Sequence, residues 1–254
     1  MAALAQSPLV ASDAADDSTI HVRVARKTFP AVADREMQQV LGNVAFDVEP
    51  RSFMILTGPS GCGKSTLLNI IAGLDQDFEG SIDLGTGRDH MAFIFQSPRL
   101  LPWRTVYENI SLVLPDGDAR HANIPDMLER VGLTQAANAY PERISLGMQR
   151  RVALARGFIL EPKILLMDEP FVSLDDPTAQ SLRALVMELW NRQPTTVLFV
   201  THDRSEAVQL GTRILRLSAG QSTVIQDAKV ELSKHERSDR AAVLREQTRI
   251  FGTV

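Results

Sequence analysis

A glycine-rich segment at residues 58–65 carries the kinds of groups that hold phosphates. Its residues are Gly58, Pro59, Ser60, Gly61, Cys62, Gly63, Lys64 and Ser65, which fit the pattern G-x-x-x-x-G-K-S/T. Glycines let backbone N–H groups turn toward phosphate oxygens, and the N-terminus of a following helix faces the same anion. Lys64 places a positive charge on the β- and γ-phosphates, and the Ser65 hydroxyl can coordinate Mg²⁺. The segment predicts a nucleoside-triphosphate site, but alone it does not separate ATPases, GTPases and kinases.

Two adjacent acids end a second apolar run. Residues 164–167 are all apolar, which is typical of a buried central strand, and Asp168 and Glu169 follow them. The carboxyl ends of parallel strands meet at one edge of a sheet, so both acids should lie beside the phosphate loop. Asp168 suits the shell of a Mg²⁺ ion, and Glu169 suits the base that polarises an attacking water.

Gln96 and His202 also close apolar runs, at 92–95 and 195–201. Taken singly, a histidine at a strand end is more often a surface or packed residue than a functional one. The order along the chain is more informative than either residue. Loop, glutamine, acids and histidine follow one another, each at the end of an apolar strand, and this order favours one shared site.

A largely parallel sheet is needed to position these residues. Short β-branched runs alternate with helical patterns, which indicates an α/β architecture. We expect an N-terminal antiparallel region and, after it, core strands and helices. The expected strands are residues 20–28, 44–48, 53–57, 91–96, 164–167, 195–201 and 213–218. The expected helices are residues 64–72, a helical region at about 105–160, a helix from 176, and a last helix on which Val243, Gln247 and Ile250 share a face.

Composition narrows the class of protein. The 254 residues are 44% hydrophobic, which is enough for one large α/β domain. With 27 basic and 31 acidic residues the net charge is −4, which argues against a sequence-independent nucleic-acid binder. The single cysteine excludes an internal disulfide and allows a reducing cytosol. No apolar run approaches the roughly 18–20 residues that span a bilayer, so we expect any membrane role to come through a partner. Residues 1–18 are small and acidic, and we expect a disordered tail there.

On these motifs the chain resembles the ATP-binding cassette (ABC) ATPases, from about residue 20 to 225. Residues 58–65 look like the Walker A loop, 164–169 like the Walker B strand with its catalytic glutamate, and 173–175 like the D-loop. Gln96 matches the Q-loop glutamine, and His202 matches the switch histidine. Phe29 sits where the family has the aromatic residue that stacks on adenine, although it could equally be a packed strand residue.

The resemblance implies the roles of individual residues in a site for ATP and Mg²⁺. The implied catalytic residues are Glu169, His202 and Gln96. The implied metal ligands are Ser65, Gln96 and Asp168. The implied nucleotide contacts are Phe29, Gly58, Pro59, Ser60, Gly61, Cys62, Gly63, Lys64, Ser65, Thr66, Ser145 and Gly147.

The family signature, Leu-Ser-Gly-Gly-Gln, is altered in this chain. The matching stretch at 144–148 keeps Ser145 and Gly147, but Leu146 replaces the first glycine and Met148 the glutamine. Ser145 can cap the following helix and offer its hydroxyl to a γ-phosphate. Leu146 restricts φ and adds bulk where the family brings backbone close to ATP. In the family each signature faces the phosphate loop of another subunit, so the resemblance implies a dimer of two copies or of two related chains.

The segment 97–110 is the expected contact with a membrane protein. It contains Leu100, Leu101 and Trp103 flanked by prolines, which is either a buried loop or an exposed apolar patch. In cassette ATPases this region receives a permease helix, and here it most resembles importers of nitrate, sulfonate, taurine and related solutes. The resemblance then implies a cytoplasmic protein held at the inner face of the membrane, with a periplasmic solute-binding protein as an indirect partner.

Alternatives remain open at this point. An exporter or lipid-trafficking ATPase is compatible with the altered signature, and a soluble cassette protein acting on DNA or ribosomes is less consistent. Such proteins usually carry a long coiled-coil insertion or a second cassette, and this chain has neither. The expected organisation is a tail at 1–18, an ATPase domain at 19–228 with a helical subdomain at about 105–160, and a charged C-terminal extension at 229–254.

Overall fold

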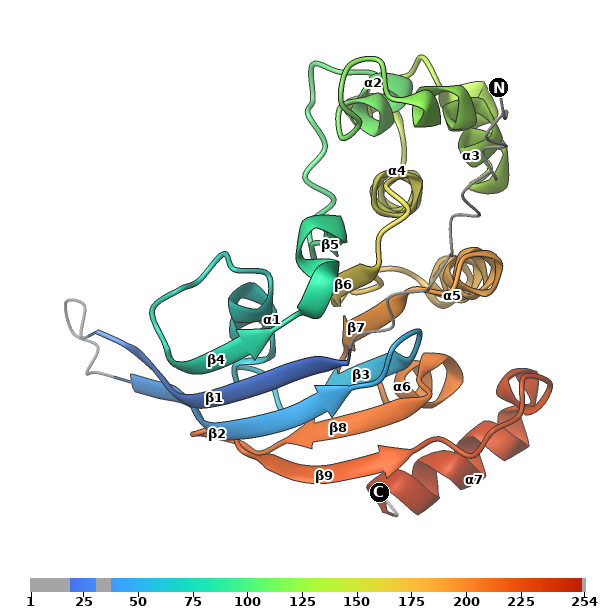
Figure 1. Cartoon of the computed structure of the whole chain (residues 1–254). Helices are drawn as coiled ribbons and strands as arrows, with labels where there is room; N and C mark the ends of the chain where they lie inside the picture. Colours follow the sequence, from blue (N-terminus) through green and yellow to red (C-terminus); the bar gives the residue numbers. More distant parts are fainter. Residues whose placement is uncertain (1–18, 31–37, 253–254) are drawn as a thin grey trace, which may run out of the picture.

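A computed structural model describes residues 19–30 and 38–252, so the predicted tail at 1–18 lies outside the described residues. The chain forms two sheets and a set of helices that lie mainly on one side of the larger sheet (Figure 1). The strands are β1 (Ile20–Phe29), β2 (Gln38–Val48), β3 (Phe53–Thr57), β4 (Glu79–Asp83), β5 (Met91–Ile94), β6 (Ile164–Asp168), β7 (Thr196–Val200), β8 (Arg213–Leu217) and β9 (Val224–Lys229). The α-helices are α1 (Lys64–Ile71), α2 (Val106–Ser111), α3 (Ile124–Arg130), α4 (Leu146–Ile159), α5 (Asp176–Arg192), α6 (Arg204–Leu210) and α7 (Arg240–Phe251). Short 3-10 segments are Gly85–His90, Ala119–Asn123, Thr134–Ala136, Pro141–Arg143 and Glu236–Ser238.

The larger sheet has the order β5-β6-β7-β3-β8-β9. Pairs from β5 to β8 are parallel, and only β9 at the edge is antiparallel. The carboxyl ends of β5, β6, β7, β3 and β8 therefore meet along one edge, although these strands are far apart in the sequence. The expected parallel core is confirmed.

Side chains on the central strands alternate between two hydrophobic cores, as the period of two in a strand requires. On β3, Phe53 and Ile55 belong to the core under the helices, whereas Met54 and Leu56 belong to the core that faces α1. The same alternation runs along β6 and β7. Both faces of these strands are buried, which explains why their sequences are apolar at every position rather than at every second one.

The smaller sheet, β2-β1-β4, is antiparallel, as expected for the N-terminal region. Its buried side chains share a core with α1, which is packed against the larger sheet on its opposite side (Figure 1). Lys27 is 3% exposed, and its ammonium group donates to the Asp75 carboxylate at 2.8 Å and to the Asp77 carbonyl at 2.6 Å. The buried Lys27 ammonium group therefore ties β1 to the segment that follows α1.

The helical region predicted at 105–160 contains α2, α3 and α4, which gather at one end of the molecule (Figure 1). Thr105 and Glu108 begin α2 with a complete capping box, in which each side chain accepts from the other residue's backbone N–H. Within the described residues, no helix is both long enough and apolar enough to cross a membrane.

The charged segment from 229 onward packs against the domain rather than standing apart from it. Val243 and Ile250 of α7 are buried in the main core, on the face that the sequence predicts. Arg237 donates to the Gln209 and Gly211 carbonyls at 2.9 Å, so it caps the C-terminal end of α6. The boundary placed at 228 therefore does not separate two packing units.

Candidate nucleotide site

The phosphate loop joins the end of β3 to the start of α1, as the motif requires. Gly63 precedes α1 with φ of +93°, a conformation that L-side chains rarely adopt. A Cβ atom at this position would lie 2.6 Å from Val40 Cγ1 and 2.8 Å from Leu41 Cδ2. Only glycine fits here, because β2 passes directly against the loop and leaves no room for a side chain.

Lys64 folds back over the loop, and its side chain is 5% exposed. Its ammonium group donates to the carbonyls of Gly58 at 3.0 Å and Pro59 at 2.9 Å. These bonds hold the positive charge at the mouth of the loop and on the same side as the α1 N-terminus. An anion placed against the loop would meet both.

Ser65 and Asp168 lie 103 positions apart in the sequence and are brought together by the fold. The Ser65 hydroxyl donates to Asp168 Oδ1 at 3.0 Å. Burial is the main cause that raises the pKa of Asp168 above its ordinary value, opposed by the Ser65 hydrogen bond and by Lys64, while the Glu169 charge adds to the rise. A hydroxyl and a carboxylate side by side are oxygen ligands of the kind Mg²⁺ takes, with phosphates and waters completing its shell.

Glu169 and His202 form the second polar pair. His202 Nδ1 lies 3.1 Å from Glu169 Oε2, and the two side chains are 59% and 20% exposed. Glu169 has φ of +41°, and its backbone N–H donates to the Val200 carbonyl at 3.0 Å. The strand pairing thus continues one residue past β6, which turns the glutamate side chain toward the end of β7. A carboxylate oriented by an imidazole suits a general base.

Gln96 is exposed and lies two residues beyond the end of β5, which stops at Ile94 rather than at 96 as the sequence suggested. Phe95 stacks on Phe93 with ring centroids 4.1 Å apart, and the Arg99 guanidinium lies 3.6 Å from the centre of the Phe95 ring. Gln96 lies at the same sheet edge as the loop and the acids.

Ser145 and Gly147 lie at the start of α4, among the helices rather than beside α1 (Figure 1). The Ser145 hydroxyl accepts from the Met148 N–H at 3.3 Å, so the predicted cap is present. Leu146 is 40% exposed and is absent from the positive-φ residues, so its replacement of glycine strains nothing in this conformation. A Cβ at Gly147 would lie 2.8 Å from Thr178 Cγ2, which explains why glycine is kept there.

Phe29 lies on a strand next to the one that contacts the loop, and Cys62 lies within the loop itself. Phe29 is 43% exposed at the end of β1, beside Lys27, whose ammonium lies 4.9 Å from the ring centre. It pairs with Gln38, two residues before the Val40 that contacts Gly63, so an exposed aromatic face stands near the loop. The thiol of Cys62 is buried, at 2% exposure. Thr66 is half-buried in the first turn of α1.

Two residues that support the site give no signal in the sequence. Ser222 is fully buried, and its hydroxyl donates to the Cys62 carbonyl, which fixes the far side of the loop. Arg156 of α4 donates to the carbonyls of Pro98 at 2.5 Å and Arg99 at 3.0 Å, so it ties the signature helix to the Gln96 loop. Both contacts join residues more than fifty positions apart, which no local pattern reveals.

Comparisons with known proteins agree with the ABC ATPase resemblance of the sequence. Residues 41–172 match the ABC transporter family. The chain is 42% identical over 216 residues to the aliphatic sulfonates import ATP-binding protein SsuB 1 of Pseudomonas savastanoi pv. phaseolicola, covering 85% of this chain and 87% of that protein. It is 41% identical over 207 residues to the SsuB protein of Bacillus subtilis, which bears the same description, covering 79% and 80%.

Among solved structures, the dimeric ATP-binding cassette MJ0796 bound to ADP and Pi aligns with a TM-score of 0.71 and 31% identity, over 84% of this chain and 100% of that chain. The fold and the site define an ATP-hydrolysing P-loop cassette. The chain belongs to the ABC transporter family, as its ATP-binding domain.

Replacing Asp168 by Asn should make the protein more stable at pH 7. A carboxyl whose pKa is raised by folding destabilises the folded state once it is ionised, and this penalty is absent below its ordinary pKa of 3.8. Asn keeps an oxygen for the Ser65 hydroxyl but carries no charge. We expect the melting temperature of Asp168→Asn to exceed that of the wild type at pH 7 and the difference to shrink as the pH falls toward 4.

Asp116, in an exposed loop, provides the control. Asp116→Asn should leave the melting temperature unchanged over the same pH range. A lower melting temperature for Asp168→Asn at pH 7 would show that the ionised carboxylate stabilises the fold.

Proposed function

We propose that this chain is the ATPase subunit of an importer for aliphatic sulfonates or closely related small anions, and that it works as a dimer on a membrane permease. The relatives with the highest similarity reported above are described as aliphatic sulfonate import proteins, and they align over most of their length. The proposal of ATP hydrolysis rests on the contact between Glu169 and His202, which lie with the phosphate loop at the carboxyl ends of the strands of the larger sheet. An exporter or soluble role has no comparable support.

We assign the following roles to the site residues, and their placement supports these roles. Lys64 and the loop N–H groups, in the segment from Gly58 to Thr66, bind the phosphates, and Phe29 provides a face for the adenine. Ser65, Asp168 and Gln96 would hold a Mg²⁺ ion, which would neutralise charge on the phosphate oxygens. Glu169 accepts the proton of the attacking water.

His202 orients the carboxylate of Glu169. With hydrogen on Nδ1, the ring donates to Oε2 and leaves the second carboxylate oxygen free for the water. The side chain of His202 is 59% exposed, so its other nitrogen is free to meet a phosphate oxygen of bound ATP in this proposal. The imidazole therefore links the base to the nucleotide.

A second chain completes the site in this proposal. Ser145 and Gly147 stand at the exposed start of α4, apart from the loop of their own chain, and the MJ0796 cassette is described as dimeric. In a head-to-tail pair each signature would meet the phosphate loop of the partner. The exposed Leu146 and the half-buried Met148 would then lie at that contact.

Glu169→Gln should keep ATP binding and lose hydrolysis. The amide is the same shape as the carboxylate but cannot accept the proton, and loss of a general base typically costs about 100-fold or more in rate. We expect a dissociation constant for ATP within about twofold of the wild type, a loss of phosphate release of that size, and an ATP-dependent dimer in light scattering. Normal phosphate release would remove Glu169 from the role of base.

The contact with a permease is proposed at residues 97–110. Trp103 is 68% exposed and Tyr107 is 37% exposed, so two aromatic side chains stand on the surface. The loop that carries Trp103 is nevertheless rigid, because the fully buried Asn109 donates to the carbonyls of Arg104 and Thr105, both at 2.9 Å. Its Oδ1 accepts from the Leu101 N–H at 2.8 Å. An exposed tryptophan on a fixed loop is typical of an interface anchor.

This surface is mechanically joined to the nucleotide site. Arg156 of α4 bonds the carbonyls of Pro98 and Arg99, so in this proposal a movement of Gln96 would be passed to the loop of Trp103 and to the helix that follows Ser145. In the proposed cycle ATP closes the dimer and shifts the permease, and hydrolysis releases it. The chain would then be cytoplasmic and held at the inner face of the membrane, with a periplasmic binding protein delivering the solute to the permease.

Trp103→Ala should uncouple the chain from its permease without affecting the nucleotide site. Truncation of a buried interface tryptophan costs about 2 kcal/mol or more, so we expect at least a tenfold weaker association with the permease. Uptake of radiolabelled ethanesulfonate by cells carrying the cognate permease should fall accordingly. The melting temperature and ATP affinity of the purified chain should not change.

Leu244, 61% exposed on α7, provides a matched control, because α7 lies at the opposite end of the molecule from α2 (Figure 1). Leu244→Ala should copurify with the permease and support uptake like the wild type. Full uptake by Trp103→Ala would exclude this surface as the permease contact, and wild-type cells that fail to import ethanesulfonate would exclude the solute class.

A further inference from the structure

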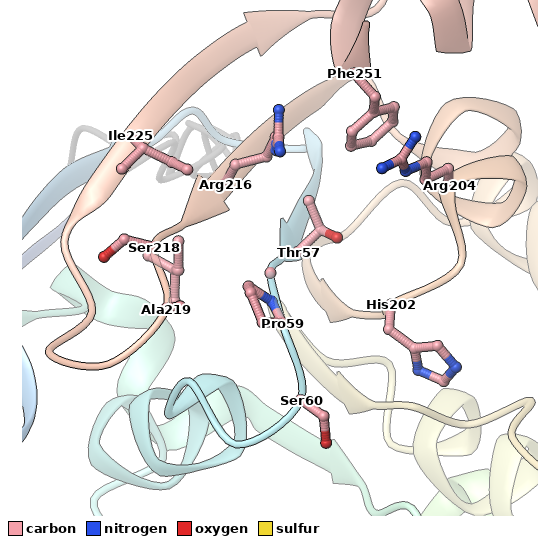
Figure 2. A pocket seen from close by; sticks show the side chains of 12 residues that line it. Thr57, Pro59, Ser60, His202, Arg204, Arg216, Ser218, Ala219, Ile225 and Phe251 are labelled. Atoms are coloured by element: carbon pink, nitrogen blue, oxygen red, sulfur yellow. The ribbon is translucent and has the colours of Figure 1, made fainter. Parts of the chain in front are cut away.

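A cavity of about 380 Å³ lies on the side of the phosphate loop that faces the C-terminal helix. Its floor is formed by Thr57 and Pro59, and His202 stands at one end. Arg204, Arg216 and Phe251 form the opposite wall, as Figure 2 shows. The volume is within the range of small-ligand sites, which begins at roughly 300 Å³.

Two guanidinium groups, those of Arg204 and Arg216, lie at this wall, and no carboxylate of the described residues pairs with either. The guanidinium groups of Arg204 and Arg216 each lie 5.4 Å from the centre of the Phe251 ring. Within the described part of the chain, neither makes an ion pair with a carboxylate, whereas the neighbouring Arg213 is paired with Asp227. Two unneutralised guanidinium groups beside one cavity attract an anion and can bind it with several N–H donors.

The wall is held in place before any ligand arrives. Gln226 accepts from Arg216 Nη1 at 2.9 Å and donates to the Ile250 carbonyl at 2.7 Å. One side chain therefore fixes both the Arg216 guanidinium and the end of the helix that carries Phe251. A site whose cationic group is already ordered loses less entropy on binding.

Part of the remaining lining is apolar, because Leu217, Ala219 and Ile225 lie beside the polar residues Ser60 and Ser218. Ile225 is 56% exposed at the rim, while Leu217 is buried at the base. An inorganic anion would leave these surfaces in contact with water, whereas an anion with a short hydrocarbon body would cover them. The cavity thus combines a cationic end, which can bind an anionic group, with an apolar end.

We propose that this cavity binds a small organic anion with an apolar body, at a position that adjoins the ATP site. The cavity shares Gly58, Pro59, Ser60 and His202 with that site, whereas Lys64, Ser65 and Asp168 do not line it. An anion bound there would alter the rate of ATP hydrolysis, since Arg204 is two residues from His202. The proposal does not depend on which solute the permease carries.

The test is calorimetric titration of the full chain with 1-butanesulfonate while the nucleotide site is saturated with ADP and Mg²⁺. We expect one butanesulfonate per chain, weaker binding of sulfate, and none of butanol. Arg204→Met and Arg216→Met should each weaken binding about tenfold or more, because each removes a charge-assisted contact. Ile225→Glu adds a repelling charge at an exposed rim position, where it leaves the fold intact, and should weaken binding as well.

Arg245→Met is the matched control, because Arg245 is an exposed arginine on α7 that does not line the cavity. It should bind butanesulfonate like the wild type. The proposal is overturned if butanesulfonate fails to bind, if ADP displaces it, or if sulfate binds as tightly. It is overturned equally if all three cavity variants bind like the wild type.

Discussion

The parallel pairing of β6, β7 and β3 is the constraint on which the site depends. The register sets Asp168 opposite Val200 and Val200 opposite Leu56, so three strands end in line. The next residues along these strands begin the phosphate loop, supply Glu169 and lead to His202. Because backbone hydrogen bonds fix the register, the spacing of Glu169, Asp168 and the phosphate loop does not rely on flexible contacts between side chains.

The position of these residues at the end of the sheet also explains how two charged side chains, Lys64 and Asp168, can both be buried. Asp168 and Lys64 are 8% and 5% exposed, and each would be costly alone. Lys64 is satisfied by two loop carbonyls and Asp168 by one hydroxyl, which is fewer bonds than a carboxylate can accept. The fold therefore leaves the Asp168 carboxylate with unused capacity to accept hydrogen bonds or bind a cation, at the point where we propose that Mg²⁺ and phosphates bind, and this lowers the stability of the folded state there.

The sequence predicts the apolar parts of this fold well and the polar edges poorly. The strand at 53–57 and the start of the helix at 64 agree with the structure, because burial on both faces and the glycine loop leave strong local signals. β4 and β9 escape notice, since they are edge strands whose residues are mostly exposed or half-buried. The strain expected from Leu146 is absent, because α4 begins at that residue and gives it a helical backbone. The contacts of Arg156 and Ser222 depend on distant backbone carbonyls, which only the folded chain reveals.

The account rests on Lys64 as the cation of a phosphate site, and measurement of ATP affinity with and without it is the most direct test. Equilibrium titration of Lys64→Ala with ATP and Mg²⁺ should give a dissociation constant at least about tenfold above the wild-type value, because a charge-assisted contact to the phosphates is lost. A melting curve like that of the wild type would show that the loop still folds. An unchanged dissociation constant in a folded variant would contradict the assignment of the loop and, with it, the rest of the site.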